Sequence, residues 1–319
     1  MSRHLVQISG DSVIMENAMT YIVDIQCSKS DSTSFIPLDE LGLSHDISEK
    51  EARVYQRIYQ LEQIAMNRLS HEAMLKETLT ALLNQNPALR QQTGYLFYTK
   101  TQTHNTFFDK HWLQTLAKSC GLRHWKSLTL SLNHCASGLS AVHLTNRMYQ
   151  NGETVPVIVL SGEKSFAPDL NKMTVGILGE MSAACLLSPL DGQWKVTASR
   201  VKHLSRFYKN PENMSATEKR AMMADFYTGM LDFLRSETLS EPEMILPYNL
   251  NLPLLNRVSR ELGWEGKLYT TNIRQTGHTY CSDVFYNLLT AETQHDFKRA
   301  LLFAAGMGVT YSSLGIARH

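Results

Sequence analysis

The feature that most constrains the fold is an unbroken apolar segment, VPVIVLSG, at residues 155–162. Strands that face solvent on one side alternate apolar and polar residues, so an apolar run of this length indicates a strand covered on both faces. Short runs at residues 94–99 (GYLFYT) and 243–247 (EMILP) have the same character, and residues 300–317 are typical of a hairpin of two buried strands. Helix-like segments separate these runs, which predicts an α/β protein with helices packed over sheets.

The rest of the chain alternates between helical and extended patterns. Residues 28–50 are polar and rich in turn formers, which favours a loop, whereas residues 51–85 carry helix formers with apolar residues at helical spacing. The strand–helix–strand order occurs in both halves of the chain, without convincing residue-level identity between them. The other predicted elements are helices at 108–120, 216–236, 251–264 and 279–290 and strands at 128–132 and 267–271.

Composition and charge argue against several classes of function. The chain has 319 residues, a formal charge of +1 and scattered Lys and Arg residues, whereas a nucleic-acid-binding surface needs a basic stripe. No apolar run reaches the roughly 18 residues of a membrane span, and the first residues lack the apolar core of a signal peptide. We therefore expect a cytoplasmic protein that binds neither nucleic acid nor a membrane.

The five cysteines are odd in number and widely spaced, and no CxxC pair occurs. This pattern predicts neither a disulfide framework nor a zinc site. His104, His111 and His124 also lack partners at metal-ligand spacing, so we expect no bound metal. Each cysteine is expected to be a buried, reduced thiol unless its surroundings indicate otherwise.

Cys135 is the cysteine whose surroundings indicate a chemical role. The extended segment 128–132 runs directly into a helix-like segment, so the thiol is expected where a strand turns into a helix. The free N–H groups and the dipole of a helix N-terminus favour a thiolate, and the same amides can bind the oxyanion formed when a thiolate attacks a thioester. The small residues at 136–138 leave room for a substrate. A structural cysteine at a tight packing site fits these residues equally well.

The segment around Cys135 resembles the nucleophile segment of the β-ketoacyl-acyl-carrier-protein synthase III family. In that family a Cys-small-Gly-aliphatic helix precedes a buried strand and a Glu-Lys pair, and residues 132–166 of this chain (LNHCASGLSAVHLTNRMYQNGETVPVIVLSGEKSF) follow the same order. Residues 174–187 (TVGILGEMSAACLL) and 306–317 (GMGVTYSSLGIA) are similar to the family's later Gly-rich segments. The resemblance extends over residues 90–190 and 243–319.

This resemblance implies a fold and an assembly. The fold is the thiolase-like α/β fold, in which two pseudo-duplicated halves form α-β-α-β-α layers. The halves would be residues 1–190, which carry the nucleophile, and residues 191–319, which carry His278 and the closing hairpin. The assembly implied is a homodimer. The substrate implied is a thioester of coenzyme A or of an acyl carrier protein, with no permanently bound cofactor.

The resemblance also implies several site residues. Cys135 would be the nucleophile, and the backbone amides of Cys135 and Gly308 would form the oxyanion hole. Phe107 and Phe108 lie where the family sends an aromatic side chain across the dimer interface into the partner's acyl pocket, although ordinary core packing is the alternative for both.

Two catalytic positions depart from the family. Tyr248 stands where the family has the His of Pro-His-x-x-Asn, and His278 stands where it has a catalytic Asn. In ordinary members these residues stabilise the charge that develops on a malonyl thioester, so their exchange puts decarboxylative condensation in question. The Gly-His-x-x-x-x-Asp pattern that ends at Asp283 resembles a branch of the family found in secondary-metabolite pathways. Some members of that branch transfer acyl groups to oxygen or nitrogen.

The residues at these positions still suggest a chemistry. A histidine with a pKa near 6.5 suits the removal of a proton from Cys135 or from an incoming hydroxyl or amine. Asp283 would orient His278, and Tyr248 or Asn251 would be polar helpers. The alternatives are a satisfied loop histidine at 278, a packed aromatic at 248, and a helix cap or surface charge at 283.

The sequence therefore predicts an acyltransferase of the ketoacyl-synthase-III-like type. It would form an acyl-enzyme on Cys135 and pass the acyl group to an acceptor, in secondary-metabolite or fatty-acid-type biosynthesis. A decarboxylative β-ketoacyl synthase and a non-catalytic partner subunit of a ketosynthase are the alternative hypotheses.

Overall fold

The computed structural model places most of the chain. Of the expected site residues, Phe107, Phe108 and Gly308 lie outside the described part. Within that part, no helix is long and apolar enough to cross a membrane. The described residues are 19–101, 111–131, 133–207, 213–236, 241–306 and 309–319.

Five strands of the first half form one part of a large mixed sheet. β9 pairs antiparallel with β1 and with β6, whereas β6, β4 and β5 run parallel to one another, which gives the order β1-β9-β6-β4-β5. Every residue of β6 is buried, as its unbroken apolar run predicts. The bounds are β1 Tyr21–Cys27, β4 Gly94–Thr99, β5 Trp125–Leu130, β6 Val157–Gly162 and β9 Ser182–Ser188.

The second half repeats this arrangement. β13 pairs antiparallel with β10 and with β12, β11 runs parallel to β12, and an isolated parallel bridge joins Ile245 of β11 to Leu268. The order and the directions therefore match those of the first half, strand by strand. The starts of β1 and β10 also pair, which joins both parts into one sheet. The bounds are β10 Trp194–His203, β11 Met244–Pro247, β12 Arg299–Gly306 and β13 Thr310–Arg318.

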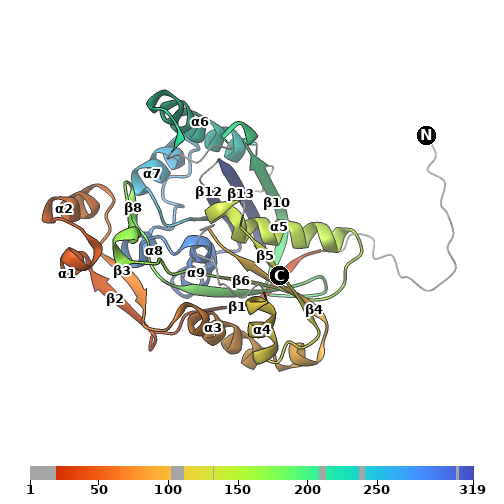
Figure 1. Ribbon diagram of the computed structural model, residues 1–319. Coiled ribbons are helices and arrows are strands. Elements are labelled where there is room, and N and C mark those ends of the chain that lie inside the picture. The colour runs from red at the N-terminus through yellow and green to blue at the C-terminus, as the bar shows by residue number, and fades with distance from the viewer. Residues whose placement is uncertain (1–18, 102–110, 132, 208–212, 237–240, 307–308) are drawn as a thin grey trace, which may run out of the picture.

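The helices complete the layers of the expected thiolase-like fold. α5 (Ser137–Gln150) packs against β4 and β6 on one side and against β10, β12 and β13 on the other, and α9 (Asp283–Gln294) packs against β1, β9, β11 and β12. Both helices therefore lie between the two parts of the sheet. Figure 1 shows α6 (Ala216–Arg235) and α7 (Leu252–Glu261) on one side of the molecule, and α3 (His71–Gln85) and α4 (Trp112–Ser119) on the opposite side. We propose that the halves divide at residue 190, in the turn between β9 and β10.

A small additional unit corrects two sequence predictions. The segment expected to be a loop contains β2 (Thr33–Pro37), and the segment expected to be helical throughout is interrupted by β3 (Gln63–Asn67), with which β2 pairs antiparallel. Ile64 of β3 is fully buried against the short helices of this unit. Its apolar side chain therefore belongs to the core face of a strand rather than of a helix. Figure 1 shows the unit projecting at one side, and it also contains α1 Leu38–Leu41 and α2 Glu49–Ile58.

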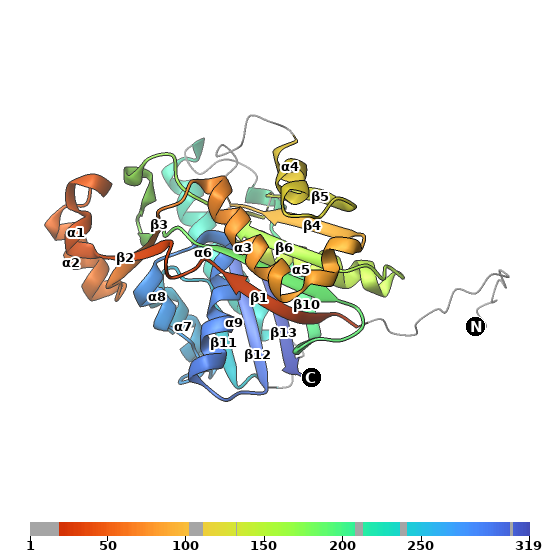
Figure 2. The same cartoon turned by 90° about the horizontal axis from the view of Figure 1, so that it is seen from below.

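The strand expected at 267–271 is reduced to a single bridge. The backbone N–H of Ile245 donates to the carbonyl of Lys267, and the N–H of Tyr269 donates back to the carbonyl of Ile245. Pairing stops there because α8 begins at Thr271 (Thr271–Thr276). The α9 helix lies beside β11 and β12, as Figure 2 shows, and α8 packs against β3. The remaining short elements are β7 Lys172–Met173 and β8 Gly176–Ile177, and the 3-10 turns at Gly42–His45, Pro87–Gln91, His134–Ala136, Pro168–Asn171, Ser205–Phe207 and Tyr280–Ser282.

Candidate active site

Cys135 lies in the turn between β5 and α5. This turn, the 3-10 turn His134–Ala136, precedes the α-helix, which begins at Ser137. His134 has φ 48°, in the left-handed region, and this conformation reverses the chain just before the thiol. The side chain of Cys135 is 9% exposed. The thiol is thus held ahead of a helix N-terminus in a nearly buried position.

His278 is brought to Cys135 by the loop before α9. Its Nε2 atom lies 3.0 Å from the Sγ atom of Cys135, and its ring is 1% exposed. The backbone of His278 is fixed on both sides, because its N–H donates to the carbonyl of Ile177 and its carbonyl accepts from the N–H of Gly179. The imidazole is therefore aimed at the thiol by a rigid segment of chain.

Asp283 completes a Cys-His-Asp triad. Its Oδ2 atom lies 2.5 Å from the Nδ1 atom of His278 and also accepts from the backbone N–H of Asn249. Its Oδ1 atom accepts from both the backbone N–H and the hydroxyl of Thr279. Because Nδ1–H donates to this carboxylate, Nε2 is the atom that exchanges a proton with Cys135. Asp283 is also the first residue of α9, where the helix dipole favours a negative charge.

The surroundings of His278 favour its protonated form. Burial acts to lower the pKa of the imidazole, but the negative charges of Asp283 and Cys135, together with their hydrogen bonds, raise the pKa well above the ordinary value. An imidazolium 3.0 Å from the sulfur stabilises a thiolate there. A proton can therefore pass between Nε2 of His278 and the sulfur of Cys135.

Tyr248 is buried beside the triad. Its ring centroid lies 6.3 Å from that of His278 in an edge-on arrangement and 5.9 Å from that of Phe303. Burial and the nearby charge of Cys135 raise the pKa of the Tyr248 phenol, so the hydroxyl keeps its proton. No described residue accepts a hydrogen bond from that hydroxyl. It is therefore available as a donor to a bound substrate.

Asn251 does not join the triad. It has φ 56° and is the N-cap of α7, where its side chain accepts a hydrogen bond from the backbone N–H of Leu254. Asn249, which no sequence pattern singled out, is buried beside Asp283. Its backbone N–H donates to Asp283, its Nδ2 donates to Thr276, and its Oδ1 accepts from Asn287. Its only signal in the sequence is its place directly after Tyr248. The amide of Gly308 and the rings of Phe107 and Phe108 lie outside the described residues.

The other described cysteines are free thiols outside the triad. Burial raises the pKa of Cys27, Cys185 and Cys281, which makes each of them a weak nucleophile. Among the described residues, no group of three His, Cys, Asp or Glu side chains could hold a metal ion. Among the described cysteines, Cys135 is the one with an imidazole nitrogen within hydrogen-bond distance of its sulfur.

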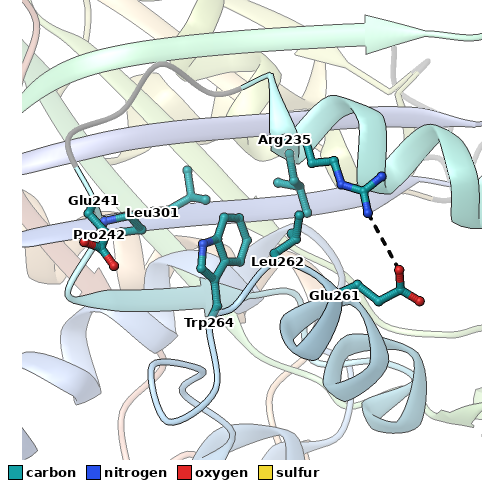
Figure 3. A pocket seen from close by; sticks show the side chains of 8 residues that line it. Arg235, Glu241, Pro242, Glu261, Leu262, Trp264 and Leu301 are labelled. Atoms are coloured by element: carbon teal, nitrogen blue, oxygen red, sulfur yellow. Dashed lines mark ion pairs between the residues drawn. The ribbon is translucent and has the colours of Figure 1, made fainter.

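A separate cavity of about 360 Å³ lies where α6 and α7 end (Figure 3). The indole of Trp264 forms one wall, and Arg235 and Glu261 form an ion pair at 3.7 Å across another. No member of the triad lines this cavity. Its other lining residues are Leu234, Glu241, Pro242, Leu262 and Leu301.

Two α/β halves of matching topology, with two helices between the two parts of the sheet, define the thiolase-like fold, and Cys135 lies in the turn before the first of these helices. No protein-family model matches the sequence, and no curated protein matches it. Solved structures do match. The acyltransferase ChlB3 superposes with a TM-score of 0.79 at 13% identity, covering 94% of this chain and 98% of ChlB3.

Two further structures share the fold. The 3-oxoacyl-[acyl-carrier-protein] synthase III of Aquifex aeolicus superposes with a TM-score of 0.72 at 14% identity, covering 93% of this chain and 99% of that one. Cerulenin-bound OleA of Xanthomonas campestris superposes with a TM-score of 0.74 at 12% identity, covering 94% and 96%. The fold is thus that of 3-oxoacyl synthase III, OleA and ChlB3.

Proposed function

We propose that this protein is an acyltransferase that carries an acyl group on Cys135. The observation that carries the proposal is the Cys-His-Asp triad, with Nε2 of His278 3.0 Å from Sγ of Cys135 and Nδ1 2.5 Å from Asp283. A cysteine, a base and a residue that orients the base are the parts needed for nucleophilic catalysis of acyl transfer. The name of ChlB3, an acyltransferase, agrees with this chemistry.

The first half-reaction follows from the charges of the triad. The Cys135 thiolate attacks the carbonyl carbon of a thioester, and the carbonyl oxygen takes the negative charge. The backbone amides of Cys135 and Gly308 would donate to this oxygen, and Tyr248 is a further candidate donor. The intermediate then expels the substrate's thiolate, which takes the proton from the His278 imidazolium. An acyl-enzyme and a neutral imidazole remain.

The second half-reaction uses that neutral imidazole. Its Nε2 atom accepts the proton of an incoming hydroxyl or amine while the acceptor attacks the acyl-Cys135 carbonyl. Collapse of the second intermediate expels the Cys135 thiolate, and the product leaves as an ester or amide. The imidazolium and the thiolate are restored together, so one proton cycles between His278 and the two substrates.

Decarboxylative condensation is the second candidate, because one of the matched structures is a 3-oxoacyl-[acyl-carrier-protein] synthase III. That reaction needs neutral donors aimed at a developing enolate. In this protein Nδ1 of His278 is committed to Asp283, and the raised pKa of the imidazole favours its charged form rather than a neutral donor. Acyl transfer fits these contacts better. The intact triad also argues against a non-catalytic partner subunit of a ketosynthase.

For the substrate we propose a thioester of coenzyme A or of an acyl carrier protein, with no permanently bound cofactor. For the assembly we propose a cytoplasmic homodimer. The apolar strand β6 lies inside the sheet between β9 and β4, so it has no free edge for a partner. One end of the sheet is β5, where Leu128 is 51% exposed. We therefore assign the dimer contact to β5.

An acylation experiment tests the function. The purified protein is incubated with a panel of acyl-coenzyme A and acyl-carrier-protein thioesters and examined by intact mass and by peptide mapping. We expect one acyl adduct on the peptide that contains Cys135, and none on Cys135→Ala. Labelling of Cys135→Ala equal to that of the wild type, or no adduct with any thioester, would exclude an acyl-Cys135 enzyme.

A further inference from the structure

The turn that carries Cys135 occurs a second time, at the start of α9. In each case a residue with positive φ precedes a cysteine in a three-residue 3-10 turn, and an α-helix begins two residues after that cysteine. His134 (φ 48°) precedes Cys135, and Tyr280 (φ 57°) precedes Cys281. The two turns touch, since the Sγ atom of Cys281 lies 3.4 Å from the carbonyl oxygen of His134. They occupy matching positions in the two halves.

Tyr280 is an unusual residue for such a turn. A bulky side chain at positive φ is strained, and glycine would adopt the same backbone freely. Strained conformations of this kind persist only where the surrounding structure imposes them, and they cluster at functional sites. The Tyr280 side chain is also 1% exposed, so it is not turned out to solvent. What the tyrosine adds at this position is a buried aromatic ring.

That ring lies against the catalytic imidazole. The ring centroids of Tyr280 and His278 are 6.0 Å apart, and their planes are inclined by 34°. The π face of a tyrosine attracts a cation at about this distance. We propose that Tyr280 is a positioning residue whose ring holds the protonated imidazole of His278 in place beside Cys135.

The other groups that face His278 are known from its contacts. Asp283 approaches from the start of α9, Cys135 from the turn before α5, and Tyr248 from the end of β11. Asp283 fixes the Nδ1 edge of the imidazole, and Cys135 receives the Nε2 edge. Both contacts are made at the edge of the imidazole, whereas Tyr280 adds an aromatic ring inclined by 34° to it.

Tyr280 itself remains neutral. Burial and the carboxylates of Glu163 and Glu180 raise the pKa of its phenol well above the ordinary value. Both carboxylates come from the first half of the chain: Glu163 follows β6, and Glu180 precedes β9. The phenol is thus a permanent, uncharged aromatic surface over the pH range in which the triad works.

The inference rests on the triad of the proposed function, but its test does not depend on an acyl substrate. The rate at which iodoacetamide alkylates Cys135 is measured against pH, with mass spectrometry of the peptide that contains Cys135, in the wild type, Tyr280→Phe and Tyr280→Leu. Without the ring the His278 imidazolium is less stable, and it therefore stabilises the Cys135 thiolate less. We therefore expect Tyr280→Leu to raise the midpoint of alkylation by about half to one pH unit, the effect of a cation–π contact of ordinary strength.

The control variants distinguish the effect of the aromatic ring from the effects of backbone strain and of lost stability. Tyr280→Phe keeps the aromatic face and should keep the wild-type midpoint. Tyr280→Gly removes the strain as well as the ring and should shift the midpoint as Tyr280→Leu does, and it serves if the leucine variant does not fold. Tyr55→Leu removes a buried tyrosine of the small β2–β3 unit and should lower the melting temperature without moving the midpoint.

Two results would overturn the inference: a wild-type midpoint in folded Tyr280→Leu or Tyr280→Gly, or a shift in Tyr280→Phe as large as that in the variants without a ring. A shifted midpoint without any acyl adduct on Cys135 would support the role of Tyr280 and refute the proposed acyl transfer. The two proposals can therefore fail separately.

Discussion

The Nε2 atom of His278 lies 3.0 Å from the Sγ atom of Cys135, although 143 positions separate the two residues in the chain. The thiol belongs to the turn before α5, and the imidazole belongs to the segment before α9. The close contact of these helices at Gly138 brings the two groups together, because the carbonyl of Cys281 lies where a side chain at 138 would have to go.

Two rate measurements should distinguish an acyltransferase from a decarboxylating, condensing enzyme. We expect His278→Ala to slow acyl transfer by about 100- to 10,000-fold, the usual contribution of a general base. The wild type should transfer acyl groups faster than it releases carbon dioxide from malonyl thioesters, and both rates can be followed with radiolabelled substrates. Near-full transfer by His278→Ala, or equal rates of the two reactions in the wild type, would favour the condensing enzyme instead.

A methyl group at position 138 should disturb the site more than the fold. A Cβ atom at Gly138 would lie 2.9 Å from the carbonyl oxygen of Cys281, a backbone atom that cannot turn away. Overpacking of this kind costs about 1–3 kcal/mol in stability, while a misplacement of about 1 Å costs about 100-fold in rate. We expect Gly138→Ala to acylate Cys135 about 100-fold more slowly in rapid-quench experiments. Gly42→Ala is the control: a Cβ there meets nothing within 4 Å, although the backbone at φ 16° and ψ −114° is strained for alanine, so it should lower stability in the β2–β3 unit and leave acylation normal.

The stability contributed by His278 should decrease as the pH rises. The pKa of its imidazole is raised in the folded protein above the value of about 6.5 that it has when unfolded. Below pH 6.5 the imidazole is protonated in both states and the contribution is complete; above pH 6.5 the unfolded state loses its proton first, so the contribution declines until the folded pKa is reached. The difference in melting temperature between the wild type and His278→Gln should therefore shrink between pH 6 and pH 9. A constant difference would contradict the raised pKa.

The edge strand β5 should determine the oligomeric state. An exposed leucine on a strand at the end of a sheet is suited to pairing with a second copy. Light scattering at micromolar concentration should give the mass of a dimer, and Leu128→Glu should shift it toward the monomer. A charged residue at Leu190, which is 70% exposed in the turn after β9, is the control and should leave the dimer intact. A monomeric wild type would contradict the assignment.

Much of the sheet could be predicted from the sequence because its strands are covered on both faces. The segments that form β4, β6, β11 and the β12–β13 hairpin contain few polar residues, so their burial can be predicted from residue type alone. The β3 strand was missed for the opposite reason. It is only five residues long and lies between two helices, so Ile64 and Met66 fitted a continuous helix as well as a strand.

The candidate site could likewise be predicted only in part. Cys135 could be suggested from its position between a strand and a helix, but its pairing with His278 came from the family resemblance, since spacing carries no information over 143 positions. Asn251 caps α7 in a left-handed conformation, a role that favours the same residue type as a catalytic amide, so the sequence cannot distinguish the two. Asn249 was missed because its link to Asp283 is made by the backbone N–H, which every residue except proline has.

The repeated turn has a consequence for how the activity could arise and be lost. One half supplies the nucleophile and the other supplies the base from matching places, so the two halves have divided between them a task that neither performs alone. The distance from Cys135 to His278 is in effect a measure of how closely the halves are docked. Any mutation that loosens their interface, however distant, should be detected first as a slower reaction of the Cys135 thiol, before the protein begins to melt.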